Sequence, residues 1–401
     1  MAVVMVAFAT PLYFDLAVAI LGNLRRARRT PRPAVRSIQL AVVVPAHEEE
    51  TMIARTVRSL LAAGCAPAAA TGPDNGSDER VFVPRVFVVA HNCTDRTIAE
   101  ATAAGAEVVV LDNPRKRGKG AALRAGFRAA HGAGANAYLV VDADSIVRPN
   151  LIAVMRAALE AGSDAIQCRY ELELPADARV FSLARLRVLA FRGINVLRAR
   201  GRAGMGFSAG LFGNGFALTN ETLVRVPFNA DSICEDIEYH IKLTCAGVSV
   251  DWVEDTAVYA PLARPGIAQA RQEARWEGGR FHVASRTSTK LVSALLRGNW
   301  RAGGMLAEAW SLPLSRGMLT LLLTVFVPLH WLHVFTLVCL LISILYVVEA
   351  ALLGPAPLKD MAALCVVPLH ILWKAAITPM VLLHTRRHTE WARTRREAQH
   401  L

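Results

Sequence analysis

The sequence has little charge for its size, because only 19% of its 401 residues are Asp, Glu, Lys or Arg, whereas 53% are hydrophobic. Disordered chains have the opposite composition. The seven cysteines form no CxxC pair and the histidines form no HExxH pattern, so neither a disulfide-stapled domain nor a zinc site of these kinds is indicated. Acidic residues are also scarce, which leaves a net charge of +12. The apolar surplus exceeds what one soluble core requires and predicts a membrane component.

Three apolar segments are long enough to cross a hydrocarbon layer of about 30 Å. They occupy residues 1–24, Met318–Leu353 and Met361–Leu383. The basic run RRARR follows the first segment, which favours an uncleaved signal anchor over a signal peptide. Because the tail at 385–401 is also basic, the positive-inside rule predicts an outside N-terminus, an inside C-terminus and three spans. A break at Pro328 would instead give two short helices and change that parity.

The basic residues cluster beside these segments, where anionic lipid headgroups attract them. No recognised nucleic-acid motif accompanies them, so we predict membrane lipids rather than nucleic acid as the partner. The two later spans together cover residues 318–384, and the residues before them, 286–317, are predicted to form interfacial helices.

Residues 37–285 alternate Val-rich runs with helical patterns, as repeated βα units do. This pattern predicts an α/β fold with a mostly parallel sheet and helices on both faces. Ligands of such sheets bind at the carboxyl ends of the strands. The expected strands are 39–46, 85–90, 106–112, 137–144 and 248–259, and the expected helices are 51–63, 94–104, 118–131, 177–200 and 233–246.

Two carboxylates, Asp142 and Asp144, stand where the strand at 137–144 gives way to a loop. Close carboxylates repel each other, and oxygen ligands suit a hard cation such as Mg²⁺ or Mn²⁺, which also neutralises a diphosphate. The alternative is a solvated turn in which Asp144 and Ser145 only bond nearby backbone amides.

Glu49 and Asp95 follow the first and second expected strands. Each could simply cap the next helix. Together with the DxD pair, however, they bring acids from three strands to one sheet edge, which is what a site for a nucleotide and its metal needs.

Glu235 and Asp236 open the helix expected at 233–246. Acids are favourable in the first turn of a helix without any chemical role. Asp236 could instead act as the general base that accepts a proton from an attacking hydroxyl. The spacing alone leaves both interpretations open.

Gln272, Arg275 and Trp276 form a QxxRW pattern ahead of the second apolar segment. Arg can pair bidentately with phosphate oxygens, and Trp offers a flat apolar face to a sugar ring. An amphipathic interfacial helix is the competing interpretation, because Trp and Arg are common there.

The motifs PAHEEE, NCTDRT, GKGAAL, DAD, ED and QxxRW occur in this order on a βαβ framework between Ser37 and Trp276. In this the chain resembles the family 2 glycosyltransferases of the GT-A fold, specifically the membrane-embedded branch related to cellulose, hyaluronan and poly-N-acetylglucosamine synthases. The resemblance implies an inverting transferase of the cell inner membrane, with a cytoplasmic catalytic domain, a nucleoside-diphosphate sugar donor and a saccharide or lipid-linked acceptor. Uridine diphosphate is its default nucleotide.

The resemblance also assigns roles to individual residues. Asp236 is the expected catalytic base, and Asp144, with Asp142, is the expected metal ligand. The expected nucleotide and donor contacts are Glu49, Asp95, Lys119, Asp142 and Asp144. The expected acceptor and pyrophosphate contacts are Asn214, Glu235, Gln272, Arg275 and Trp276.

Two departures bear on the acceptor. Glu273 follows Gln272, where processive synthases usually have Gln or Arg, and three spans are few for a chain that exports a polymer through itself. Addition of one or a few sugars is therefore at least as well supported, and an export partner is unknown. The alternatives are a polyprenyl-phosphate sugar synthase, a catalytically inactive nucleotide-sugar-binding scaffold of an export complex, and a transporter. A transporter requires polar residues within several spans, and Asp15 and Lys374 are among the few present.

Overall fold

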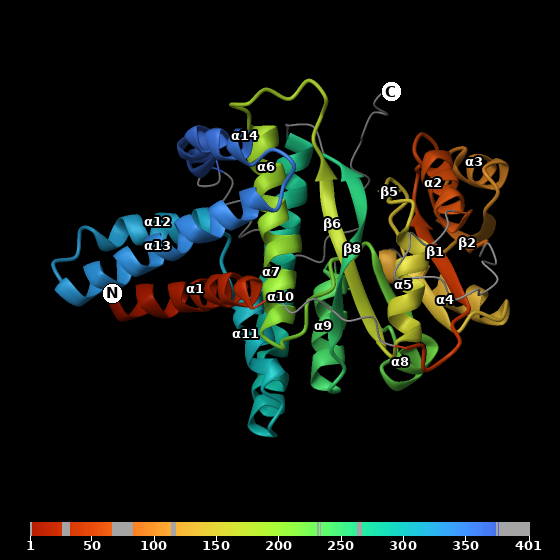
Figure 1. Cartoon of the computed structure of the whole chain (residues 1–401), viewed down its shortest axis with the longest axis horizontal. Coiled ribbons are helices and arrows are strands. Elements are labelled where there is room, and N and C mark those ends of the chain that lie inside the picture. Colours follow the sequence, from red (N-terminus) through yellow and green to blue (C-terminus); the bar gives the residue numbers. More distant parts are fainter. Residues whose placement is uncertain are drawn as a thin grey trace. The chain divides into compact units, whose positions relative to one another are not determined.

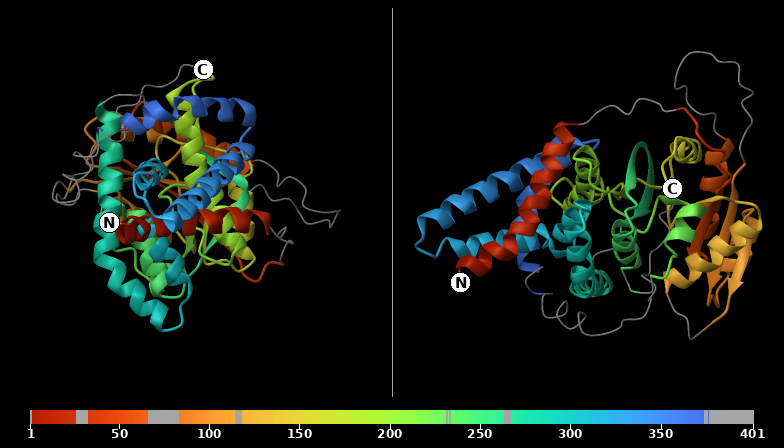
Figure 2. Two further views of the ribbon diagram at one scale, coloured as in Figure 1. Left: turned by 90° about the vertical axis from the view of Figure 1, so that its left-hand side faces the viewer. Right: turned by 90° about the horizontal axis from the view of Figure 1, so that it is seen from below.

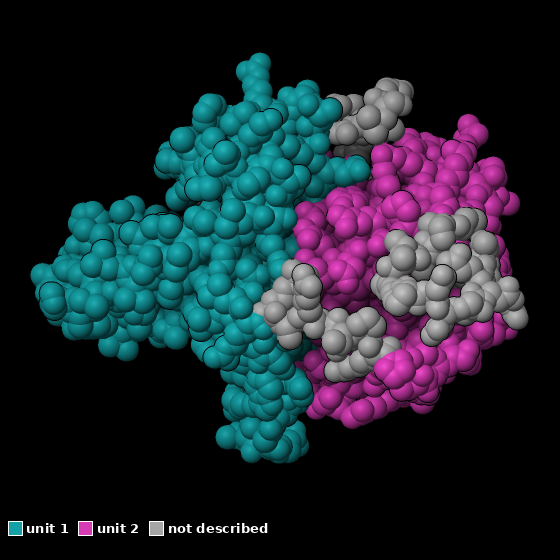
Figure 3. Space-filling model, viewed as in Figure 1, with its two compact units in different colours: residues 1–27, 172–209, 265–388 teal, residues 28–171, 210–264, 389–401 magenta. Residues whose placement is uncertain are grey.

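A computed structural model describes residues 2–25, 33–65, 83–113, 118–230, 232, 234–262, 267–373 and 376. The chain divides into two compact units, which have different colours in Figure 3. Unit 1 contains Met1–Ala27, Leu172–Ala209 and Pro265–His388, and unit 2 is built mainly from Arg28–Glu171 and Gly210–Arg264. Each unit is described separately.

Unit 2 is built on an eight-stranded sheet with the order β3-β2-β1-β4-β7-β6-β8-β5 (Figure 1). One half is parallel and consists of β1 (Leu40–Ala46), β2 (Arg85–His91), β3 (Glu107–Leu111) and β4 (Ala137–Val140). The remaining strands are β5 (Ile146–Val147), β6 (Ala165–Glu173), β7 (Phe216–Thr219) and β8 (Val250–Pro261). The β4–β7, β6–β7 and β5–β8 pairs are antiparallel.

Helices cover both faces of this sheet, so each face carries its own apolar core. One core packs the sheet against α2 (Ile53–Cys65) and α5 (Leu151–Glu160), and α3 (Thr97–Ala103) packs against α2. The other packs it against α4 (Lys119–Gly132), α8 (Asn220–Arg225) and α9 (Glu235–Cys245). Val42, Val43 and Val44 are completely buried on successive positions of β1. A strand buried on both faces needs such a continuous apolar run.

The four parallel strands and the helices between them confirm the predicted βα units. The sheet is mixed rather than mostly parallel, because β5 to β8 form an antiparallel half. β4 ends at Val140, so Asp142 and Asp144 lie in the loop after the strand and not at its end. The expected helix at 177–200 begins later, at Leu183, and continues to Gly204.

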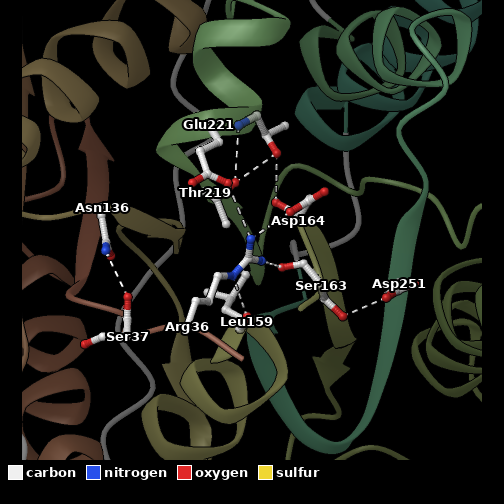
Figure 4. Close-up of polar contacts among 10 residues, drawn as sticks. Arg36, Ser37, Asn136, Leu159, Ser163, Asp164, Thr219, Glu221 and Asp251 are labelled. Carbon is white, nitrogen blue, oxygen red and sulfur yellow. Dashed lines mark hydrogen bonds and ion pairs between the residues drawn. The ribbon is translucent and has the colours of Figure 1, made fainter. Parts of the chain in front are cut away.

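Arg36 anchors the start of unit 2 to the end of α5 (Figure 4). Its guanidinium donates to the Leu159 carbonyl at 2.8 Å and to the Asp164 carboxylate at 2.9 Å, and it also donates to the Ser163 carbonyl. The Glu221 carboxylate lies 3.6 Å away. One cation thus ties together groups at and just after the end of α5, where the Leu159 carbonyl also accepts from the Gly162 N–H at 3.0 Å.

We expect Arg36→Ala to lower the free energy of unfolding by about 2–3 kcal/mol, because several hydrogen bonds to a charged group disappear together. Chemical denaturation of the purified protein measures this loss. Arg96→Ala is the matched control, since the Arg96 side chain forms an ion pair with Glu100 at 77% exposure; it should cost well under about 1 kcal/mol. Equal losses in the two variants would contradict the anchoring role.

Unit 1 is helical. Its central rod is α6 (Leu183–Arg192), a π-helical segment (Gly193–Leu197) and α7 (Arg198–Gly204). The other helices are α1 (Ala2–Leu24), α10 (Ile267–Leu296), α11 (Arg301–Trp310), α12 (Leu314–Thr324), α13 (His330–Leu352) and α14 (Pro357–Ala362). α1 crosses α7 so closely that a Cβ atom on Gly201 would overlap the backbone of Ala19. The glycine is required by this approach of two backbones.

Asp15, the acid within apolar α1, is buried against α7. Its carboxylate lies 2.6 Å from the Arg202 guanidinium and 3.1 Å from that of Arg198. An ionised group excluded from water requires such partners. Asp15 therefore has a structural explanation, which weakens the transporter interpretation; Lys374 lies outside the described residues.

The segment Met318–Leu353 is not one helix. α12 ends at Thr324 and α13 begins at His330, and Pro328 lies in the break, where it can neither donate a backbone hydrogen bond nor continue a helix. α12 and α13 lie beside α1 (Figure 2). α12 has 11 residues, about 17 Å, which is too short to span a bilayer alone.

Two of the described helices, α1 and α13, are long and apolar enough to cross a membrane. Each has 23 residues, or about 35 Å of helix. This is weaker support for a membrane protein than the three expected spans. The third expected segment, Met361–Leu383, lies partly outside the described residues, and its described part includes the end of α14 and helical residues 367–373.

Candidate active site

The loops after β1 and β2 are joined by reciprocal hydrogen bonds. Asp95 accepts hydrogen bonds from the Glu50 backbone N–H at 3.2 Å and from the Thr97 N–H and hydroxyl. The Thr97 hydroxyl accepts from the Glu49 N–H at 2.8 Å. Because β1 and β2 are parallel neighbours, both loops lie at the carboxyl edge of the sheet. The structure thus brings Glu49 and Asp95 together, as the sequence predicts, although Asp95 also serves as a helix-capping acceptor.

Lys119, the first residue of α4, is the cation at the centre of the neighbouring acids. Its ammonium donates to the Gly213 carbonyl at 2.6 Å and contacts the Asp142 carboxylate at 2.6 Å and that of Glu235 at 3.8 Å. Burial lowers the pKa of Lys119, but Asp142 and Glu235 outweigh this effect and raise the pKa above its ordinary value. Lys119 therefore stays protonated and joins the loop of Asp142, the turn at Gly213 and the start of α9.

Glu235 and Asp236 lie at the start of α9, next to Lys119. Burial raises the pKa of the Glu235 carboxyl to about 8, and burial also raises that of Asp236 to about 6. Lys119 acts in the opposite direction on both groups. A raised carboxyl pKa in a buried group suits proton transfer near neutral pH.

The glycine-rich turn before β7 allows this cluster to form. Gly213 has φ +73°, a left-handed conformation, and a Cβ atom there would lie 3.3 Å from both the Asp236 carboxylate and the Lys119 ammonium. A side chain would be strained and would also crowd the two charged groups. The turn thus passes its backbone directly beside them.

Asn214 and Tyr170 also lie beside Asp142. The Asn214 side chain is buried and accepts a hydrogen bond from the Asp142 backbone N–H at 3.1 Å. Tyr170, on β6, is hydrogen-bonded to Asn214, and burial raises the pKa of its hydroxyl, as does the charge of Asp142. Tyr170 was not predicted, because it lies in β6, an antiparallel strand that hydrophobic periodicity did not reveal.

Asp142 and Asp144, in the loop after β4, are the candidate ligands of a divalent cation. Among the described residues, no group of three or more His, Cys, Asp or Glu side chains could hold a metal ion. Asp142 and Asp144 nevertheless supply carboxylate oxygens from one loop, and Mg²⁺ is commonly held by one or two protein carboxylates together with substrate phosphates. The donor set therefore fits a cation whose remaining ligands come with the substrate.

The QxxRW residues lie on α10, in unit 1. The side chains of Gln272 and Arg275 are outside the described residues, whereas that of Trp276 is 48% exposed. Their convergence with the acids of unit 2 remains a prediction.

The parallel half-sheet, the joined loops at its edge and the buried acid–lysine cluster occupy one continuous part of the sequence. The model of the family described as "Glycosyltransferase like family 2" matches residues 38–279. The chain belongs to glycosyltransferase family 2. It is a glycosyltransferase, and its mixed α/β sheet covered by helices is consistent with the GT-A fold.

Solved structures resemble this glycosyltransferase in fold. A mannosyltransferase from Pyrobaculum calidifontis, in complex with GDP-Man and Mn²⁺, matches with a TM-score of 0.52 and 15% identity, and the match covers 93% of this chain and 98% of that one. The glucosyl-3-phosphoglycerate synthase from Mycobacterium tuberculosis, in complex with Mn²⁺, UDP and phosphoglyceric acid, gives a TM-score of 0.40 and 21% identity over 63% of this chain and 78% of that one. No curated protein matches the transferase significantly.

Proposed function

We propose that this glycosyltransferase moves a sugar, with inversion, from a nucleoside-diphosphate sugar to a saccharide or lipid-linked acceptor at a membrane. The observation that supports this most directly is the cluster of Asp142, Lys119 and Asp236. It places the loop of Asp142, a candidate contact for a diphosphate and its cation, beside a carboxyl whose raised pKa suits proton transfer. The acid–lysine contact argues against an inactive scaffold, which would not need this charge arrangement.

The chemistry assigns a separate task to each part of the cluster. An acceptor hydroxyl attacks the anomeric carbon while Asp236 takes its proton, and the bond from that carbon to the diphosphate oxygen breaks. The nucleoside diphosphate leaves with the electron pair. Direct attack from the opposite side inverts the anomeric centre. Lys119 keeps Asp236 closer to its ionised form than burial alone would allow.

A divalent cation held by Asp144, with Asp142, would neutralise the charge that develops on the departing diphosphate. Mn²⁺ or Mg²⁺ is present in structures of the glucosyl-3-phosphoglycerate synthase, and Mn²⁺ accompanies GDP-Man in the mannosyltransferase. Glu49 and Asp95 are proposed to contact the nucleoside, and Gln272, Arg275 and Trp276 the pyrophosphate and acceptor.

Membrane attachment through unit 1 is supported by its exposed apolar side chains. Large hydrophobic residues are exposed on all three neighbouring helices, and examples are Val3 and Phe8 on α1, Leu322 and Leu323 on α12, and Leu337 and Leu341 on α13. Contiguous apolar surface of this kind needs a cover, and lipid chains fit helices of this length. We therefore propose an inner-membrane protein whose catalytic unit faces the cytoplasm.

A polyprenyl phosphate is the acceptor we consider second, because a membrane-attached transferase meets lipid-linked substrates directly. The experiment incubates the purified protein in detergent with a panel of UDP- and GDP-sugars, Mn²⁺ or Mg²⁺, and either polyprenyl phosphate or an oligosaccharide. Release of nucleoside diphosphate that depends on one acceptor supports transfer and identifies its class. If the parent consumes no donor with any acceptor, and so does not differ from Asp236→Asn, the proposed function is wrong.

The pH dependence of transfer follows from the raised pKa of Asp236. A general base must be ionised, so kcat/KM is expected to fall as the pH decreases through about 6, rather than near 4, where an exposed carboxyl titrates. Initial rates measured at saturating metal between pH 5 and 8 provide the test. A rate that stays constant down to pH 5 would exclude Asp236 as the base.

A further inference from the structure

Asn214 connects two loops of the site through its side-chain amide. It is completely buried. Its Oδ1 atom accepts a hydrogen bond from the Asp142 backbone N–H at 3.1 Å, and its Nδ2 atom donates to the Ser145 hydroxyl at 2.9 Å. One side chain thus holds both ends of the DAD loop, Asp142 at its start and Ser145 directly after it.

Ser145 extends this constraint to Asp144. The Ser145 side chain is also completely buried, and its hydroxyl donates to the Asp144 carboxylate at 3.4 Å. A hydroxyl has one proton to donate and two lone pairs that accept. Because Asn214 donates to the Ser145 oxygen, the single Ser145 proton remains available for Asp144. The amide therefore sets the direction in which Ser145 donates.

Asn214 is itself held by strand β6. The Gln167 amide donates to the Asn214 carbonyl at 2.8 Å and to the Gly215 carbonyl at 3.2 Å, and its oxygen accepts from the Phe212 N–H at 3.1 Å. Gln167 is completely buried, and Tyr170 is hydrogen-bonded to the Asn214 side chain. Strand β6 thus holds the turn that carries Asn214 in place through hydrogen bonds from Gln167.

We propose that Asn214 is a positioning residue, which acts through Ser145 and the Asp142 backbone to preorganise the two loop carboxylates for a divalent cation and a diphosphate. The inference rests on the proposed function and refines it. It differs from the expectation that Asn214 contacts the donor sugar or acceptor, because the side chain is completely buried and its amide bonds the DAD loop. Residues that orient ligands in this way affect metal affinity strongly.

The test measures Mn²⁺ affinity rather than turnover alone. Full-length Asn214→Ala and the milder Ser145→Ala are titrated with Mn²⁺ in the presence of UDP or GDP, and free Mn²⁺ is followed by electron paramagnetic resonance. Both variants should bind Mn²⁺ about ten- to a hundredfold more weakly than the parent. In steady-state assays the Mn²⁺ concentration for half-maximal rate should rise more than kcat falls.

Asn136→Ala is the matched control. Asn136 also bridges two backbone groups: it accepts from the Gln39 N–H at 2.7 Å and donates to the Ser37 carbonyl at 3.0 Å (Figure 4). It precedes β4, however, whereas the DAD loop follows that strand. Its loss should lower thermal stability without changing Mn²⁺ affinity.

The outcomes separate the two proposals. Unchanged Mn²⁺ affinity in Asn214→Ala, or an equal loss in Asn136→Ala, would overturn the positioning role while sugar transfer by the parent stands. Failure of the parent to bind Mn²⁺ with either nucleotide would overturn the positioning role, whereas sugar transfer is overturned only if the parent consumes no donor with Mn²⁺ or Mg²⁺.

Discussion

Asp236→Asn is expected to reduce turnover of the donor sugar by about a hundred- to ten-thousandfold, the range that a positioned general base contributes. The amide keeps the size of the side chain but cannot accept a proton from the acceptor hydroxyl. Donor binding should change little, because the carboxylates proposed to hold the diphosphate and its cation, Asp142 and Asp144, remain. Single-turnover transfer and equilibrium binding of the unhydrolysed donor measure the two quantities separately.

Glu238→Gln provides the control for Asp236→Asn on the same helix. Glu238 lies outside the cluster and pairs at 2.7 Å with Lys242, one helical turn further along α9. Glu238→Gln therefore makes the same acid-to-amide change on the same helix. Its activity should match that of the parent. If Asp236→Asn keeps full turnover, Asp236 is not the base; if both variants lose activity equally, the loss reflects α9 rather than its first carboxylates.

Lys119→Met is expected to lower the free energy of unfolding by about 2–4 kcal/mol near neutral pH, because it leaves the buried Glu235 and the half-buried Asp142 and Asp236 without their cation. Transfer should also be largely lost, since the turn at Gly213 loses its 2.6 Å bond to the ammonium. Thermal unfolding and initial rates of the variant and the parent measure the two effects.

The stability loss in Lys119→Met should depend on pH. Removing Lys119 raises the pKa values of Glu235 and Asp236 further, since the lysine lowers both. A carboxyl with a raised pKa in the folded state binds more protons folded than unfolded, so stability falls as the pH increases from about 4 through the folded pKa. The difference in Tm from the parent should therefore be larger at pH 8 than at pH 5. Lys242→Met, at the half-buried Glu238 pair outside the cluster, should show no such trend.

Periodicity predicted the parallel half of the sheet well, because a strand buried on both faces must be apolar at nearly every position. The run at Val42–Val44 is an example. Hydrophobic periodicity did not reveal β6, whose nine residues contain Arg169, Tyr170 and Glu171. These polar residues are stabilised by contacts remote in sequence; Arg169, for example, pairs with Glu254 at 3.0 Å on β8. Local patterns cannot contain that information.

The acids of the site were predicted from their positions after strands and from the family resemblance, and their partners were not. Asp142 and Asp236 were expected near each other, but nothing in the spacing indicated that Lys119 would lie between the acids or that Gly213 would pass beside them. The reason is that α4, the turn before β7 and α9 meet only when the sheet is assembled.

The amino-acid sequence by itself determined the family, the order of the βα units and the residue types that carry the chemistry, because these depend on local patterning and on motifs in a fixed order. Only the tertiary structure decided that the sheet has an antiparallel half, that Asp15 is neutralised by α7, and that Asn214 holds the DAD loop through Ser145. These features consist of contacts between residues far apart in the chain, where burial rather than local preference makes a partner necessary.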